Sequence, residues 1–154
     1  MKAISLLQPW ATLAAIGAKR IETRSWKSPY RGPLAIHASK GFPEWARERC
    51  FDWRILDALV AEGIHSFREL PLGVIIATCE LVACLPIPPN PFKAGFPYRD
   101  TIRYVQLPPD EPELSFGDYT PNRWAWVLDN VQRLPAPVPA RGALGVWEWN
   151  KATP

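Results

Sequence analysis

Three residues at alternate positions, Glu22, Arg24 and Trp26, carry groups that suit the recognition of a nucleotide. Arginine offers a planar fork that matches a phosphate or a base edge. Tryptophan offers a stacking plane worth about 1–3 kcal/mol per base, and a glutamate accepts hydrogen bonds from an exocyclic amine. In a strand all three would project from one face within about 14 Å. With Lys19 just before them, they predict a nucleotide pocket.

Other polar and aromatic residues of the first forty extend this set, although each also has a structural interpretation. Glu22 and Arg24 could form a cross-strand ion pair, and Trp26 could belong to the core. His37 could be a half-buried histidine with satisfied hydrogen bonds, and Lys40 could be solvated. The candidate ligand-binding residues in this part of the chain are Trp10, Lys19, Glu22, Arg24, Trp26, Tyr30, Arg31, His37 and Lys40.

The distribution of charge also points to an anionic partner. Residues 1–54 hold ten Lys and Arg against four Asp and Glu, whereas the rest hold eight against eleven, within a formal net charge of +3. Proteins that track a duplex commonly make about six to ten phosphate contacts. A short single strand, a strand end or one nucleotide therefore suits this chain better.

Hydrophobic periodicity predicts an α+β fold. A short helix from Pro9 is expected to end at Gly17, and a long helix over 43–63 would bury Trp53, Leu56 and Val60. Strand-rich chains of this length usually close into a sandwich or barrel. The expected strands cover residues 21–26, 34–39, 74–85, 123–133 and 145–150, with a possible edge strand over 101–107.

The chain is expected to form one domain over residues 1–154, with a proline-rich, acidic insertion at about 86–121. Its three cysteines make no CxxC pair, so no metal and no cofactor are predicted. It has neither an apolar stretch of about 18 residues nor a signal-peptide pattern. We therefore expect a cytoplasmic protein without membrane contact.

Three stretches closely resemble the ASCH domain, the activating-signal-cointegrator homology domain. They are Ser5–Ala11 (SLLQPWA), Gly17–Trp26 (GAKRIETRSW) and Tyr30–Lys40 (YRGPLAIHASK). The resemblance implies a PUA-like mixed β-barrel of five to six strands, with two or more flanking helices and a cleft that serves RNA biology. It would build the cleft from Lys19, Glu22 and Arg24, with Trp10, Tyr30, Arg31, His37, Tyr119 and Arg123 nearby.

The resemblance leaves catalysis open. Some small relatives are implied to hydrolyse an acylated cytidine-type nucleoside with a Lys-x-x-Thr motif, but here Lys19 is followed three positions later by Glu22. Thr23 is adjacent but belongs to the opposite face of the strand. Glu22 could still activate water, with Lys19 stabilising an oxyanion.

The primary prediction is thus binding of RNA or of a modified nucleoside or nucleotide. The alternatives are hydrolysis of an N4-acylated cytidine-type nucleoside or of RNA by Lys19 and Glu22, and a protein-interaction module that uses the proline-rich segment.

Overall fold

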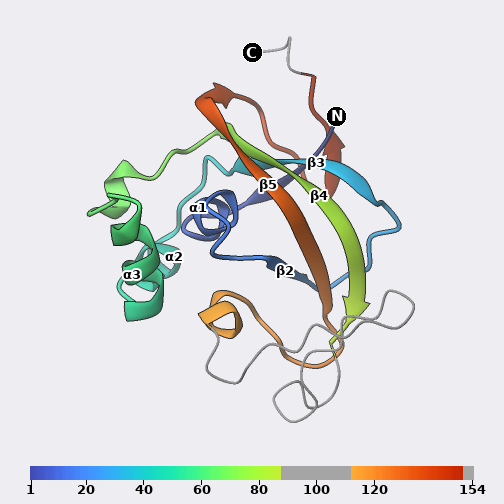
Figure 1. Ribbon diagram of the computed structural model, residues 1–154, viewed down its shortest axis with the longest axis horizontal. Helices are drawn as coiled ribbons and strands as arrows, with labels where there is room; N and C mark the ends of the chain where they lie inside the picture. The colour runs from blue at the N-terminus through green and yellow to red at the C-terminus, as the bar shows by residue number, and fades with distance from the viewer. Residues whose placement is uncertain (88–111, 151–154) are drawn as a thin grey trace.

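The computed structural model describes residues 1–87 and 112–150, which form one six-stranded sheet curled around helix α1 (Figure 1). The strand order is β2-β5-β4-β3-β1-β6; β1 and β3 run parallel, and the other neighbours are antiparallel. The strands are β1 (Lys2–Leu6), β2 (Ile21–Arg24), β3 (Gly32–Ala38), β4 (Val74–Pro86), β5 (Trp124–Pro139) and β6 (Val146–Glu148). The helices are α1 (Trp10–Ala15), α2 (Glu44–Arg49) and α3 (Trp53–Ala61), with 3-10 turns η1 (Phe67–Glu69) and η2 (Pro112–Phe116).

The curl comes from the two longest strands. Strands β4 and β5 have 13 and 16 residues, and their pairing shifts register at three places along its length. Extra residues of this kind bend a strand and increase its local twist. The result is a curled half-barrel, which confirms the predicted α+β, PUA-like architecture.

Helix α1 lies inside the curl and links the sheet to the other helices (Figure 1). Ala11 and Ala14 belong to the core cluster of the sheet, whereas Leu13 packs into the cluster around α3. The buried Gln8 fixes the start of the helix, because its amide donates to the Pro71 carbonyl and accepts from the Thr12 N–H. Gly17, with φ of +78°, ends this segment as expected.

The prediction of one long helix over 43–63 is wrong. The segment forms two helices, α2 and α3, and the Asp52 side chain caps the second by accepting from the Arg54 N–H. The buried face of α3 also differs from the predicted one. Ile55 and Leu59 are buried, whereas Trp53 and Val60, which we expected in the core, are 62% and 41% exposed.

Two other differences concern strands. The sequence analysis missed β1, although it pairs with both β3 and β6 and buries Ala3, Ile4 and Leu6. Strand β5 also continues six residues beyond its predicted end at Arg133. The expected edge strand over 101–107, and most of the proline-rich segment with its possible protein partner, lie outside the described residues.

A small polar network joins the C-terminal loop to the centre of the sheet. His37 on β3 is buried, and its ring nitrogens lie 3.0 Å from Ser5 Oγ and 3.1 Å from the Ala140 carbonyl oxygen. Its ring also packs edge-on against Trp147, whose indole N–H donates to Ser5 Oγ. Burial lowers the pKa of His37, which the hydrogen bond to Ala140 partly offsets. His37 therefore acts as a structural anchor for this loop.

We predict that Gly142→Ala destabilises the protein, because a Cβ at position 142 would clash with the ring of His37 and with Ser5 Oγ. His37 is held on several sides, so overpacking should cost roughly 1–3 kcal/mol in the free energy of unfolding. Urea denaturation measures this change. Gly41→Ala is the control, since a Cβ there would meet no described atom within 4 Å. Equal stability of the two variants would contradict the anchoring role of His37.

Candidate ligand-binding cavity

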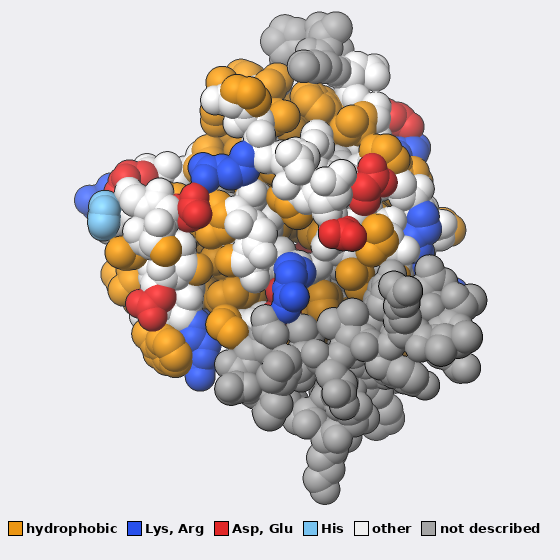
Figure 2. Space-filling model, viewed as in Figure 1, with side chains coloured by type: hydrophobic (Ala, Val, Ile, Leu, Met, Phe, Trp, Pro, Cys, Tyr) orange, Lys and Arg blue, Asp and Glu red, His pale blue; other side chains and the backbone are white. Residues whose placement is uncertain are grey.

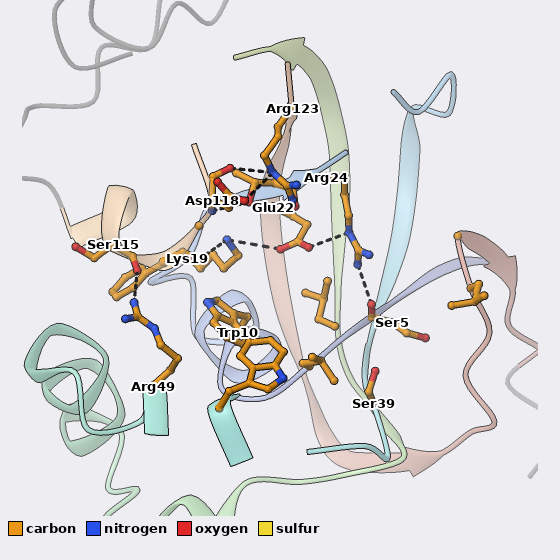
Figure 3. Close-up of a pocket in the computed structure, with 18 of the residues that line it drawn as sticks. Ser5, Trp10, Lys19, Glu22, Arg24, Ser39, Arg49, Ser115, Asp118 and Arg123 are labelled. Carbon is orange, nitrogen blue, oxygen red and sulfur yellow. Dashed lines mark hydrogen bonds and ion pairs between the residues drawn. The ribbon is translucent and has the colours of Figure 1, made fainter. Parts of the chain in front are cut away.

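A cavity of about 640 Å³ opens where β2, α1, α2 and η2 meet the loop before β6, and we call it the β2 cavity (Figure 3). Its walls come from segments far apart in the sequence. The lining side chains that carry polar or aromatic groups are Ser5, Trp10, Lys19, Glu22, Thr23, Arg24, Ser39, Trp45, Arg49, Ser115, Phe116, Asp118 and Arg123.

Alternation along β2 sets the inner wall. Ile21 and Thr23 are buried, whereas Glu22 and Arg24 are only partly covered; Glu22 and Arg24 line the cavity together with the edge of Thr23. Strand β2 pairs with β5, which fixes its orientation. The Thr23 hydroxyl accepts a hydrogen bond from the Asp118 N–H. The predicted placement of Glu22 and Arg24 on one face thus agrees with the structure, and Thr23 has a structural partner.

Lys19 lies almost completely buried behind Glu22. Its side chain is 1% exposed, and its ammonium group donates to the Ile21 carbonyl and, at 2.8 Å, to the Phe116 carbonyl. The same nitrogen lies 3.5 Å from Glu22 Oε2. Two of its three N–H donors therefore go to backbone oxygens while its charge faces the carboxylate. This arrangement favours a role in holding the site over direct contact with a ligand.

Arg24 flanks Glu22 on the other side. Its Nε lies 2.9 Å from Glu22 Oε1, in an ion pair whose N–H direction does not meet hydrogen-bond geometry. Its Nη2 donates to the Ser5 carbonyl at 2.8 Å and so links β2 to β1. Figure 3 shows the Glu22 carboxylate between the two cations. Lys19, Glu22 and Arg24 thus form one charged row, with Glu22 in the middle.

The segment around η2 forms the wall that adjoins β2 and is held by a buried carboxylate. Glu113 accepts hydrogen bonds from the backbone N–H groups of Arg20 and Ile21. Burial raises the pKa of Glu113, although Lys19 and the two backbone donors act against this rise. Beyond η2, Arg123 pairs with Asp118 at 3.3 Å and donates to the Thr23 carbonyl. These contacts place Asp118 and Arg123 at the rim.

Two further residues complete the cavity, and the sequence analysis missed both: Trp45, which pairs with the predicted Trp10, and the cation Arg49. Trp45 on α2 is 56% exposed, and its ring centroid lies 5.7 Å from that of Trp10 at an angle of 39°. Arg49, one turn further along α2, donates to the Ser115 carbonyl. The spacing of 45 and 49 could have indicated a shared helix face. The sequence did not show that this face would meet α1.

Two predicted residues, Trp26 and Tyr30, line a different cavity, together with Lys2, Ser28, Pro29, Gly145 and Val146. Strand β2 ends at Arg24, so the strict alternation that would have kept Trp26 beside Glu22 stops before it. Trp26 instead packs edge-on against Trp126, with ring centroids 4.7 Å apart. Tyr30 donates its hydroxyl to the Pro33 carbonyl. Both cavities touch Gly145, so they are neighbours on the surface.

The remaining candidates are spread out. His37 and Lys40 line a third cavity, beside the loop at residues 139–144. Arg31 donates to backbone carbonyls of its own turn, at Ser28 and Tyr30. Tyr119 is buried in an apolar cluster with Ile21 and Ala125. Of the predicted set, the β2 cavity therefore brings together Trp10, Lys19, Glu22, Arg24 and Arg123, and their roles toward a ligand stay predictions.

The described residues contain no group of three or more His, Cys, Asp or Glu placed to hold a metal ion. All three cysteines are unpaired and buried. Burial raises the pKa of Cys79 to about 12, so this thiol is a poor nucleophile near neutral pH. None of the helices within residues 1–87 and 112–150 has the length and hydrophobicity that a bilayer crossing needs.

Comparison with known proteins gives a consistent family match. The family model of the ASCH domain matches residues 4–134. The chain is 28% identical over 147 residues to activating signal cointegrator 1 of Homo sapiens and 26% identical over 147 residues to that of Mus musculus. Each match covers 94% of this chain but 22% of the relative. The chain thus spans about a fifth of the length of these curated relatives.

We predict that Lys19→Met lowers the free energy of unfolding by roughly 3–5 kcal/mol, since removing one partner of a buried ion pair leaves the other uncompensated. The Phe116 and Ile21 carbonyls would also lose a donor. Chemical denaturation measures the change. Lys40→Met is the control, because Lys40 is exposed and surface changes are usually within about 0.5 kcal/mol. A Lys19→Met protein as stable as the control would show that this ammonium group does not hold the site.

Proposed function

Because the chain belongs to the ASCH domain family, we propose that it binds RNA and that the β2 cavity takes one unstacked nucleotide of a single strand. The observation that carries this proposal is the Glu22 carboxylate, held between Lys19 and Arg24 in a cavity with two tryptophans on its wall. Proteins that recognise single-stranded RNA commonly stack an aromatic ring on the face of a base and hydrogen-bond the edge of that base with a polar group.

The size of the cavity supports a ligand as small as one nucleotide. Ligand pockets in proteins commonly measure about 300–1,000 Å³, and the β2 cavity, at about 640 Å³, lies within this range. Trp45 is more than half exposed at the rim, where a base could stack on it without displacing core side chains. Trp10 and Trp45 meet at an angle, so they offer faces in two directions.

The arrangement of charge supports a short ligand rather than a duplex. Three arginines of the cavity keep part of their side chains exposed: 26% for Arg24, 43% for Arg49 and 27% for Arg123. On the face seen in Figure 2, basic side chains are scattered singly among acidic and apolar ones and form no broad basic patch. Three partly exposed arginines around the β2 cavity could neutralise a few phosphates of a short single strand.

We predict that Trp45→Ala weakens binding of a short single-stranded RNA by about 1–3 kcal/mol, the usual value of one base–aromatic stack. Fluorescence anisotropy with a labelled oligoribonucleotide at low salt measures this change. The matched control is Trp53→Ala, because Trp53 is 62% exposed on the neighbouring helix and does not line the β2 cavity. An equal loss in both variants, or none in either, would contradict the site.

We further predict a shallow salt dependence. Single-stranded nucleic acid contributes about −0.7 per phosphate contact to the slope of log affinity against log salt, so three arginine contacts give roughly −2. Arg49→Gln should reduce this slope by about 0.7, whereas Arg54→Gln, outside the cavity, should leave it unchanged. Titrations from low to moderate salt measure both slopes. A wild-type slope near −6 would instead indicate a long track over the surface.

A further inference from the structure

The Glu22 carboxylate has hydrogen-bond capacity that the described protein does not use. Its side chain is 13% exposed, and its printed neighbours, Lys19 and Arg24, approach as ion pairs at 3.5 and 2.9 Å. Within residues 1–87 and 112–150, neither of its oxygens accepts a hydrogen bond. An ionised carboxylate has about four lone-pair sites over its two oxygens. Glu22 is therefore a fixed acceptor pair that a ligand could satisfy.

The cations on either side hold this acceptor pair in place. Lys19 is buried and bound to two backbone carbonyls, and Nη2 of Arg24 is bound to the Ser5 carbonyl, which keeps both cations beside Glu22. A ligand group that enters between them meets two carboxylate oxygens side by side, with positive charge beyond each. The best complement is a pair of adjacent N–H donors with a carbonyl oxygen next to the pair.

Among the four RNA bases, the Watson–Crick edge of guanine has this pattern. Guanine presents N1–H and N2–H side by side, and its O6 acceptor follows next to N1. Cytosine and adenine each present one amine next to a ring nitrogen lone pair, which a second carboxylate oxygen would repel. Uracil presents one N–H between two carbonyls. Only guanine satisfies both Glu22 oxygens and turns its carbonyl toward a flanking cation.

We infer that the β2 cavity selects guanine, with Glu22 accepting from N1–H and N2–H while the base stacks against Trp10 or Trp45. This inference rests on the proposed function, because it concerns the ligand of the same cavity. It makes Glu22 the residue that determines specificity and leaves the tryptophans and arginines to provide affinity for any base. A good bidentate contact discriminates by about 1–3 kcal/mol, which corresponds to about 5- to 150-fold in affinity.

The test uses labelled RNA pentamers of uridine in which the central residue is guanosine, inosine, adenosine, cytidine or uridine. The guanosine pentamer should bind the wild-type protein about 5- to 150-fold more tightly than the uridine pentamer. Inosine keeps N1–H and O6 but lacks the N2 amine, so its pentamer should lose a large part of this preference. The inosine comparison changes the ligand alone and cannot unfold the protein.

The protein variants give the second comparison. Glu22→Gln replaces one acceptor by a donor and should abolish the preference for guanosine while the uridine pentamer still binds. Glu62→Gln is the matched control, because Glu62 lies just after α3 and pairs with Arg133 at 2.7 Å, away from the cavity. This variant should keep the full preference.

The outcomes separate the two ideas. Equal affinity of the wild-type protein for all five pentamers, or a preference for another base, would overturn guanine selection and leave RNA binding intact. A guanosine preference that survives in Glu22→Gln, or that inosine shares in full, would overturn the role of Glu22. Failure of every pentamer to bind would overturn the proposed function and this inference together.

Discussion

The buried ammonium group of Lys19 joins the segments on which the β2 cavity depends. It lies after α1, donates to the first residue of β2 and to Phe116 at the end of η2, and faces Glu22. A charge buried to this extent is stable only when it is paired and hydrogen-bonded. The packing of η2 against the start of β2 supplies one of these hydrogen bonds, from Lys19 to the Phe116 carbonyl. That contact also brings Ser115 and Asp118 into the lining of the cavity that contains Glu22.

Glu113 provides the complementary half of this arrangement. Its carboxylate is buried and accepts from the backbone N–H groups of Arg20 and Ile21. The η2 segment thus contributes an acidic side chain to the start of β2, and its Phe116 carbonyl accepts from the basic side chain of Lys19. Both contacts join residues more than 90 positions apart. Because a buried ionic group left without its partner is costly, the two contacts support each other. The base of the cavity wall is thus held by these two charged side chains.

The sequence predicted those features that depend on local periodicity. Alternation correctly separated Glu22 and Arg24 from Ile21 and Thr23, and the apolar runs located β3 and β4. Alternation did not place Trp26 correctly, because β2 ends two residues earlier. Periodicity also did not divide residues 43–63 into α2 and α3, the second of which Asp52 caps. Trp45 and Arg49 were missed because their place in the cavity depends on how α2 packs against α1 and η2, which is a tertiary contact. Glu113 has backbone partners that leave no pattern in the sequence.

The same contacts bear on whether the cavity binds or catalyses. A general acid or an oxyanion donor must reach the reacting atoms with an available N–H, yet Lys19 is 1% exposed and spends two donors on backbone carbonyls. Thr23, the hydroxyl next to the strand face, accepts from the Asp118 N–H and is buried. What remains accessible is a fixed carboxylate, three partly exposed arginines and two indole faces. These are groups that recognise and orient a ligand, and their rigidity lowers the entropic cost of binding it. Lys19 and Thr23 are thus committed to structural contacts, and Glu22 is the group of the hydrolysis alternative that still faces the cavity.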